Sequence, residues 1–326
     1  QKKEWFSCIG DGIQECRNTW EHKKWNITDL PEFELAITID RPELYYDFLQ
    51  KDWTRFCHDY WKNNFLEHHT LSQKRVTRIY IGNQFCHNLF PRKELLFQVL
   101  EKALENNLAV TLAFSYIRNH LLEEIDELLQ ELEVWCQSRE KEAGKDQEEI
   151  IVNDWAMPIL LQGKPHLKPV LGVLLNKRRK DVRLPYKHGI GNHVDSLAEN
   201  NLNCGFYQDY LKNTFDIQRF EFESCGYKVT IPDGHHSLHL PFFQTNTSQY
   251  CTLYAVCRYG DRGKQKLPEN CPRYCNKKVF LYPKHMKMVG RYNSLFGYDE
   301  KILWDEKQLQ DYLEQGIDRI VVNVSL

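Results

Sequence analysis

The chain has 326 residues, 42% of them hydrophobic and 13% aromatic, so it is long enough to bury a large core in one or two domains. Its formal net charge of −2 gives no strong nucleic-acid signal, and no apolar stretch reaches the length of a membrane span. The basic run at residues 177–180 is the one local exception, and a solvated loop is its ordinary explanation. The first residues lack the apolar region of a signal peptide, which predicts a cytoplasmic protein.

Runs of β-branched and apolar residues predict strands at residues 34–40, 76–82, 108–114, 149–152, 170–175, 217–222, 237–243 and 317–324. Most are separated by helical patterns, predicted from Pro42 onward and at residues 91–106, 117–136, 155–161, 207–212 and 307–315.

This alternation predicts a parallel sheet covered by helices, and the number of units favours a closed (β/α)8 TIM-barrel-like fold over an open doubly wound sheet. No GxGxxG follows the first strand, so a dinucleotide-binding fold loses its main support. We expect residues 1–32 to form an N-terminal extension and residues 33–326 to form the barrel that carries the functional site.

Cysteine is the most informative residue type in this chain. There are 11 cysteines, and an odd number in a chain without a secretory signal argues against a disulfide framework. The densest group is Cys257, Cys271 and Cys275, in a segment whose glycines and prolines allow it to fold back on itself. Thiolates are ligands for soft metal centres, and a structural zinc usually shows two close pairs of ligands. One close pair with more distant single cysteines therefore favours an iron–sulfur cluster, with buried or free thiols as the alternative.

The fourth ligand must come from elsewhere in the chain. Cys86 follows the predicted strand at residues 76–82, and barrel active sites are built on the loops that follow the strands. Cys86 is therefore favoured as the fourth ligand, and Cys251 is the alternative. A radical-SAM site is disfavoured because the position three residues after Cys275 is Lys278.

At these cysteines the chain resembles the peptidase U32 family, and most closely its oxygen-independent hydroxylase branch, typified by the ubiquinone-pathway proteins UbiU and UbiV. The resemblance rests on Cys86, on Cys257 followed by a basic stretch at residues 258–270, and on the Cys271–Cys275 pair. The strand ending in Asn153 and Asp154 and the closing helix and strand at residues 313–322 add to it. Residues 1–30 and 177–212 have no counterpart, and Cys251 with Cys257 also resembles the close pair of UbiU-like members, which leaves the fourth ligand open.

The resemblance implies a (β/α)8 barrel with a four-iron four-sulfur (4Fe-4S) cluster. It implies hydroxylation without molecular oxygen, with prephenate as oxygen donor and an aromatic, nucleobase or peptide substrate. Many members act with a paralogous partner subunit. The predicted function is therefore an oxygen-independent hydroxylase or hydroxylase subunit, and the alternatives are a non-catalytic, cluster-bearing partner subunit and a U32-type peptidase.

Two further groups of residues are weaker candidates. The histidines of the turn at residues 234–239 could bind a metal, although histidines in polar turns are usually solvated or hydrogen-bonded. Polar residues at or near predicted strand ends could touch a substrate or cap the following helices, and these are Asp40, Asn83, Asn153, Asp154, Asn176 and Glu223.

Overall fold

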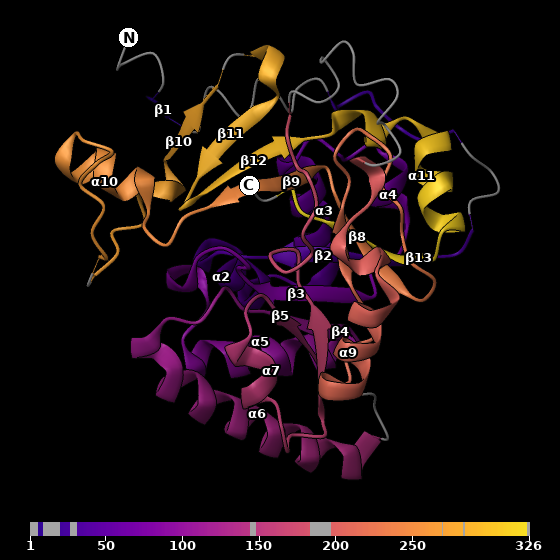
Figure 1. Ribbon diagram of the computed structural model, residues 1–326, viewed down its shortest axis with the longest axis vertical. Coiled ribbons are helices and arrows are strands. Elements are labelled where there is room, and N and C mark those ends of the chain that lie inside the picture. The colour runs from indigo at the N-terminus through magenta and orange to yellow at the C-terminus, as the bar shows by residue number, and fades with distance from the viewer. Residues whose placement is uncertain are drawn as a thin grey trace.

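The centre of the protein is an eight-stranded parallel sheet in the order β6-β5-β4-β3-β2-β13-β8-β7 (Figure 1). The computed structural model describes residues 6–8, 20–26, 31–143, 148–182, 197–268, 270–282 and 284–324. The strands are β2 (Glu34–Ile39), β3 (Arg78–Gly82), β4 (Ala109–Ala113), β5 (Glu148–Val152), β6 (Leu167–Leu171), β7 (Glu221–Glu223), β8 (His236–Leu240) and β13 (Ile317–Val322).

The first and last strands of this sheet approach each other. Leu171 and Phe220 form an isolated parallel bridge, and the Leu171 backbone N–H donates to the Arg219 carbonyl at 3.0 Å. The sheet is thus nearly closed into a barrel, and the predicted TIM-barrel-like (β/α)8 fold is confirmed. β6 begins and ends earlier than predicted, because the backbone turns at Gly172, whose carbonyl accepts from the Leu175 N–H at 3.1 Å.

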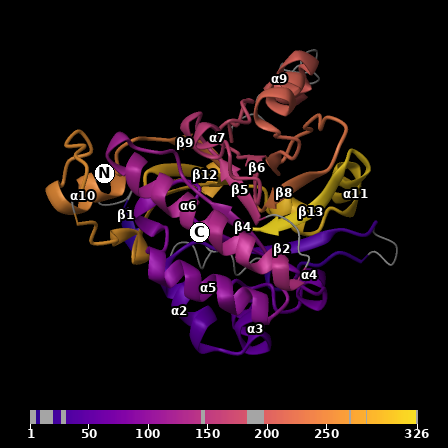
Figure 2. The ribbon, with the colours of Figure 1, turned by 90° about the horizontal axis from the view of Figure 1, so that it is seen from below.

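The connections between the parallel strands carry α2 (Pro42–Gln50), α3 (Trp53–Asn63), α4 (Thr70–Gln73), α5 (Lys93–Glu105), α6 (Leu122–Ala143), α7 (Ala156–Leu160), α9 (Gly205–Phe215) and α11 (Glu306–Glu314). The buried residues of α5 show why these segments are helical: Leu96, Val99, Leu100 and Ala103 recur at the spacing of one helix face. Figure 2 shows α9 projecting away from the rest of the molecule. No helix in the described part of the chain is long and apolar enough to cross a membrane.

A second, antiparallel sheet lies beside the barrel (Figure 1). Its order is β1-β10-β11-β12-β9, made of β1 (Phe6–Cys8), β10 (Lys278–Leu281), β11 (Met288–Arg291), β12 (Ser294–Tyr298) and β9 (Phe242–Thr247). β9 begins two residues after β8 ends, so the chain passes directly from the barrel into this sheet. Helix α10 (Thr252–Tyr259) follows β9. The sequence did not predict this sheet.

Described parts of the predicted N-terminal extension are packed against the rest of the protein. β1 pairs with β10, and the side chains of Trp20 and Trp25 are buried. The Trp25 indole N–H donates to the Ile302 carbonyl at 2.9 Å. These residues therefore contribute to the hydrophobic core.

The interior of the barrel differs between its two ends. At the end where the strands begin, Arg319 donates to Glu149 at 2.7 Å and Arg78 donates to Glu34 at 2.8 Å. Above this ionic layer lies a small apolar cluster of Ala36, Tyr80, Ala113, Ile151, Val170 and Val321. Beyond it, at the carboxyl ends of the strands, a cavity opens that is lined by both polar and apolar residues. Active sites of TIM barrels are built at that end, while the opposite end serves stability.

Candidate functional site

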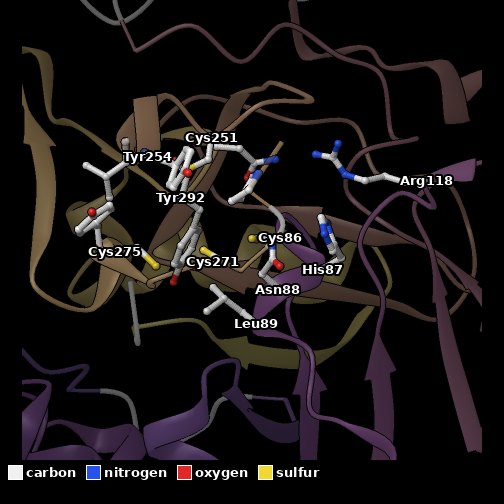
Figure 3. A pocket seen from close by; sticks show the side chains of 14 residues that line it. Cys86, His87, Asn88, Leu89, Arg118, Cys251, Tyr254, Cys271, Cys275 and Tyr292 are labelled. Atoms are coloured by element: carbon white, nitrogen blue, oxygen red, sulfur yellow. The ribbon is translucent and has the colours of Figure 1, made fainter. Parts of the chain in front are cut away.

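Four cysteine side chains line one pocket where the antiparallel sheet meets the barrel (Figure 3). Cys86 lies in the loop after β3, and Cys251 immediately precedes α10. Cys271 and Cys275 come from the segment between α10 and β10. Three stretches of chain that are distant in sequence therefore bring thiols to the same pocket.

The loop that carries Cys86 is held by Asn83, one of the residues predicted at a strand end. The Asn83 Oδ1 accepts from the backbone N–H groups of Phe85 and Cys86, each at 2.9 Å. The Asn83 side-chain amide in turn donates to the Asp40 carbonyl at 3.3 Å. Asn83 thus fixes the position of Cys86 relative to the end of β2.

Cys251 and Cys257 have different surroundings although both belong to the α10 region. The Cys251 Sγ accepts from the Tyr254 N–H at 3.3 Å, as a helix cap, and donates to the Tyr292 carbonyl at 3.1 Å. Cys257 lies six residues further along, which corresponds to a rise of about 9 Å and a different helix face. Cys257 is not among the residues that line the pocket. The structure therefore groups Cys86, Cys271 and Cys275 with Cys251.

The hairpin between β11 and β12 supports the cysteine pocket from the other sheet. The Arg291 guanidinium donates to the Cys275 carbonyl at 3.0 Å, and the Asn293 amide donates to the Tyr116 hydroxyl at 3.1 Å. Tyr292, at the tip, is only 3% exposed and has φ of 56°, in the left-handed region. A bulky residue in that region costs of order 1 kcal/mol or more, and such strain often marks functional sites.

Burial disfavours the thiolate form of three of the four cysteines in this pocket, because it raises their pKa values. Desolvation raises the pKa of Cys251 to about 12 and that of Cys275 to about 11, and it raises the pKa of Cys86 further still. Protonated thiols are poor nucleophiles, so Cys86, Cys251 and Cys275 are poorly suited to nucleophilic catalysis. A bound metal centre would take the same groups as thiolates, with release of their protons.

The side chains that could act as ligands in this pocket include four thiols. Within the described residues, no three His, Cys, Asp or Glu side chains are arranged to hold one metal ion. A structural zinc needs all its ligands about 2.0–2.3 Å from one point. All four cysteines line one pocket, and sulfur-only ligation is typical of iron–sulfur clusters.

A second cavity lies at the mouth of the barrel and shares Tyr292 with the cysteine pocket. Three of the predicted strand-end residues line it, namely Asp40, Asn83 and Glu223. The others act in the framework: Asn153 donates to the Phe114 carbonyl at 2.7 Å, Asn176 donates to the Glu221 carbonyl at 3.1 Å, and Asp154 accepts from the N–H groups at the start of α7.

His239 also lines the barrel-mouth cavity and is bonded through Nε2 to the buried Glu221. Burial alone would raise the pKa of Glu221, but the hydrogen bond and charge of His239, with the charge of Arg319, hold it below its ordinary value. Sequence reasoning named His239 only as one of three histidines of a candidate metal turn. Those histidines are engaged separately, since His235 pairs with Asp318 at 2.9 Å and His236 stacks on Phe220.

The basic run at residues 177–180 is partly internal. Lys180 is paired with Glu223, and Arg178 donates to the Cys225 sulfur at 3.0 Å. These two side chains are therefore committed to contacts within the protein instead of forming a basic surface.

No protein-family model, characterised protein or solved structure matches this chain, so its function has to be argued from the site itself.

Proposed function

We propose that this protein is an iron–sulfur oxidoreductase whose cluster is held by Cys86, Cys251, Cys271 and Cys275. The observation that carries the proposal is the pocket that these four thiols line together, beside the carboxyl ends of the barrel strands. When bound, such a cluster supplies one-electron transfer.

The surrounding residues have separable roles in this proposal. Asn83 holds the Cys86 loop, and Arg291 holds the loop of Cys275. A substrate in the barrel-mouth cavity lies beside the cluster pocket, because Tyr292 lines both. His239, oriented by Glu221, is the group in that cavity suited to accept or donate a proton.

Oxygen-independent hydroxylation, the activity implied by the U32 resemblance, is the specific reaction we propose. Arg118 lines the cysteine pocket, and its guanidinium donates to neutral oxygens of Tyr116 and Gln249. Its charge is therefore available to a carboxylate, which supports prephenate as the oxygen donor on the cluster side.

The cluster is tested with two alanine variants in one helical region. After anaerobic purification, the wild-type protein is expected to contain iron and acid-labile sulfide, and Cys251→Ala is expected to lose most of both. Cys257→Ala removes a thiol outside the pocket and is the matched control, expected to keep a full complement.

Iron-free wild-type protein would refute the proposal. Loss of iron in Cys257→Ala with retention in Cys251→Ala would replace the ligand set by Cys86, Cys257, Cys271 and Cys275. The reaction itself is tested by anaerobic incubation of the loaded protein with 18O-labelled prephenate and candidate acceptors, followed by mass spectrometry. Absence of label transfer from the protein alone, with transfer in the presence of a paralogue, would indicate a subunit role.

A further inference from the structure

Tyr292 separates the cysteine pocket from the barrel-mouth cavity and contributes to the lining of both. Its ring is almost fully buried, yet its hydroxyl has no hydrogen-bond partner among the described residues. A buried hydroxyl left without a partner is unfavourable, because it has lost its hydrogen bonds to water. The protein therefore maintains both an unpaired hydroxyl and a left-handed backbone at one residue.

A second buried polar atom without a partner belongs to another residue of the cavity lining. The Oδ1 atom of Asp40 is buried and has no hydrogen-bond partner within the described part of the chain. Asp40 lines the barrel-mouth cavity, at the end of β2, and its charge acts on the Tyr292 hydroxyl. Two residues of the cavity lining thus carry an unused donor, the Tyr292 hydroxyl, and an unused acceptor, the Asp40 Oδ1.

The other charged groups of the cavity are already neutralised. The Glu223 carboxylate is paired with Lys180 and also accepts from the Gln244 N–H at 2.6 Å. His239 is bonded to Glu221. No lysine or arginine lines the cavity in the described residues, so an anionic group placed there would lie beside the Asp40 carboxylate, with the charges of Arg291 and Arg41 acting only from outside the lining.

The size of the cavity limits what can enter. Its volume of about 30 Å³ suffices for one functional group, while the remainder of a ligand would lie outside. A carbonyl oxygen of that group would accept from Tyr292, and an adjacent N–H would donate to Asp40.

We infer that the barrel mouth is a binding site for an uncharged carboxamide or lactam edge, held between the Tyr292 hydroxyl and the Asp40 carboxylate. This inference deepens the proposed function, since it assigns the substrate class of the site beside the cluster. It excludes a carboxylate such as that of prephenate from this cavity. An anionic oxygen donor would instead bind in the cysteine pocket, beside Arg118.

Benzamide and benzoate are a suitable pair of probes, because they have the same shape and differ in charge and in the N–H donor. Binding to the anaerobically purified protein is measured by calorimetry or by ligand-observed NMR. Benzamide is expected to bind and benzoate to bind at least about tenfold more weakly, since a hydrogen bond to a charged group contributes about 1.5–3 kcal/mol.

Two variants test the named residues. Tyr292→Phe is expected to weaken benzamide binding by about two- to tenfold, the range for one neutral hydrogen bond. It should unfold at the same or a higher urea concentration than wild type, because it removes an unpaired hydroxyl and leaves the ring in place. Tyr312→Phe changes another deeply buried tyrosine, on α11, that does not line this cavity, and is expected to bind benzamide as wild type does.

The inference is overturned if benzoate binds as well as benzamide, if Tyr292→Phe binds benzamide with unchanged affinity, or if neither probe binds. Iron analysis of the same samples separates this result from the cluster proposal. Iron-free protein that binds benzamide through Tyr292 would refute the cluster alone, whereas iron-loaded protein without the benzamide preference would refute the substrate site alone.

Discussion

Replacing Arg319 by methionine is expected to destabilise the protein by about 3–5 kcal/mol, the range for removing one partner of a buried ion pair. Arg319 is 2% exposed, and its guanidinium donates to both Glu149 oxygens, at 2.7 and 3.0 Å. Methionine would fill much of the same space but leave Glu149 buried, with Arg78 as its nearest remaining cation at 3.3 Å.

The pKa of Glu149 reflects the combined effect of burial and of all its neighbours on the charged carboxylate. Burial alone would raise that pKa, but the Arg319 and Arg78 guanidiniums hold it at about 2, against an ordinary value of 4.5. At about 1.36 kcal/mol per pH unit, this difference corresponds to about 3 kcal/mol of stability at neutral pH. Because the folded-state pKa is the lower one, this stability is present above pH 4.5 and is lost as the pH falls toward 2.

Urea unfolding at pH 7 measures the effect, with Arg55→Met as control. Arg55 forms an ion pair with Asp59, but its side chain is 63% exposed, so its loss should cost less than about 1 kcal/mol. Arg319→Lys keeps the charge but loses the bidentate contact with Glu149, so its free energy of unfolding should lie between those of wild type and Arg319→Met. It provides a measurement if the methionine variant does not fold. A loss below about 1 kcal/mol in Arg319→Met, with an unchanged denaturant slope, would refute this account of the barrel interior.

Two further predictions concern single buried positions. Burial lowers the pKa of His69 from 6.5 to about 4, so stability should fall by about 3 kcal/mol as the pH drops from 6.5 to 4, and His69→Gln should flatten the dependence of unfolding free energy on pH across that window. An equal dependence of unfolding free energy on pH in wild type and His69→Gln would contradict this prediction. Gly82→Ala should destabilise the protein by more than about 2 kcal/mol in urea unfolding, because φ is 106° and the new Cβ would lie 2.6 Å from the Ala113 carbonyl oxygen. Gly163→Ala, with φ of 80° and open space around it, controls for backbone strain alone, and an equal loss in both variants would refute the steric argument.

The barrel could be predicted from the sequence because its strands are buried on both faces. Segments such as β2 and β13 are rich in apolar residues and almost fully buried, and the helix that precedes β13 has a clear periodicity. The antiparallel sheet lacks both signals. Its strands β10 and β11 have four residues each, and the turn between β11 and β12 is formed by Tyr292 and Asn293 without the glycine that usually marks a tight hairpin.

The choice of cluster ligands among the cysteines likewise depends on structure that the sequence pattern does not reveal. Linear spacing favours Cys257, because it precedes the Cys271–Cys275 pair by a short segment. The helix α10 was not predicted, and it is the geometry of this helix that puts Cys257 on a different face from Cys251. Cys86, in contrast, could be placed from its position after a barrel strand, which is where the structure has it.

One hairpin joins the two sites, and this determines how they can influence each other. Arg291 bonds to the backbone of Cys275, the carbonyl of Tyr292 accepts from Cys251, and the side chain of Tyr292 lines the barrel mouth. The β11–β12 ladder runs continuously up to the turn, from Met288 to Arg291 on one strand, so the tip cannot move without disturbing that pairing. A ligand that fixes the Tyr292 hydroxyl therefore also fixes the backbone against which two of the proposed cluster ligands rest. By thermodynamic reciprocity, any effect of a barrel-mouth ligand on binding in the cysteine pocket is matched by an equal effect in the opposite direction.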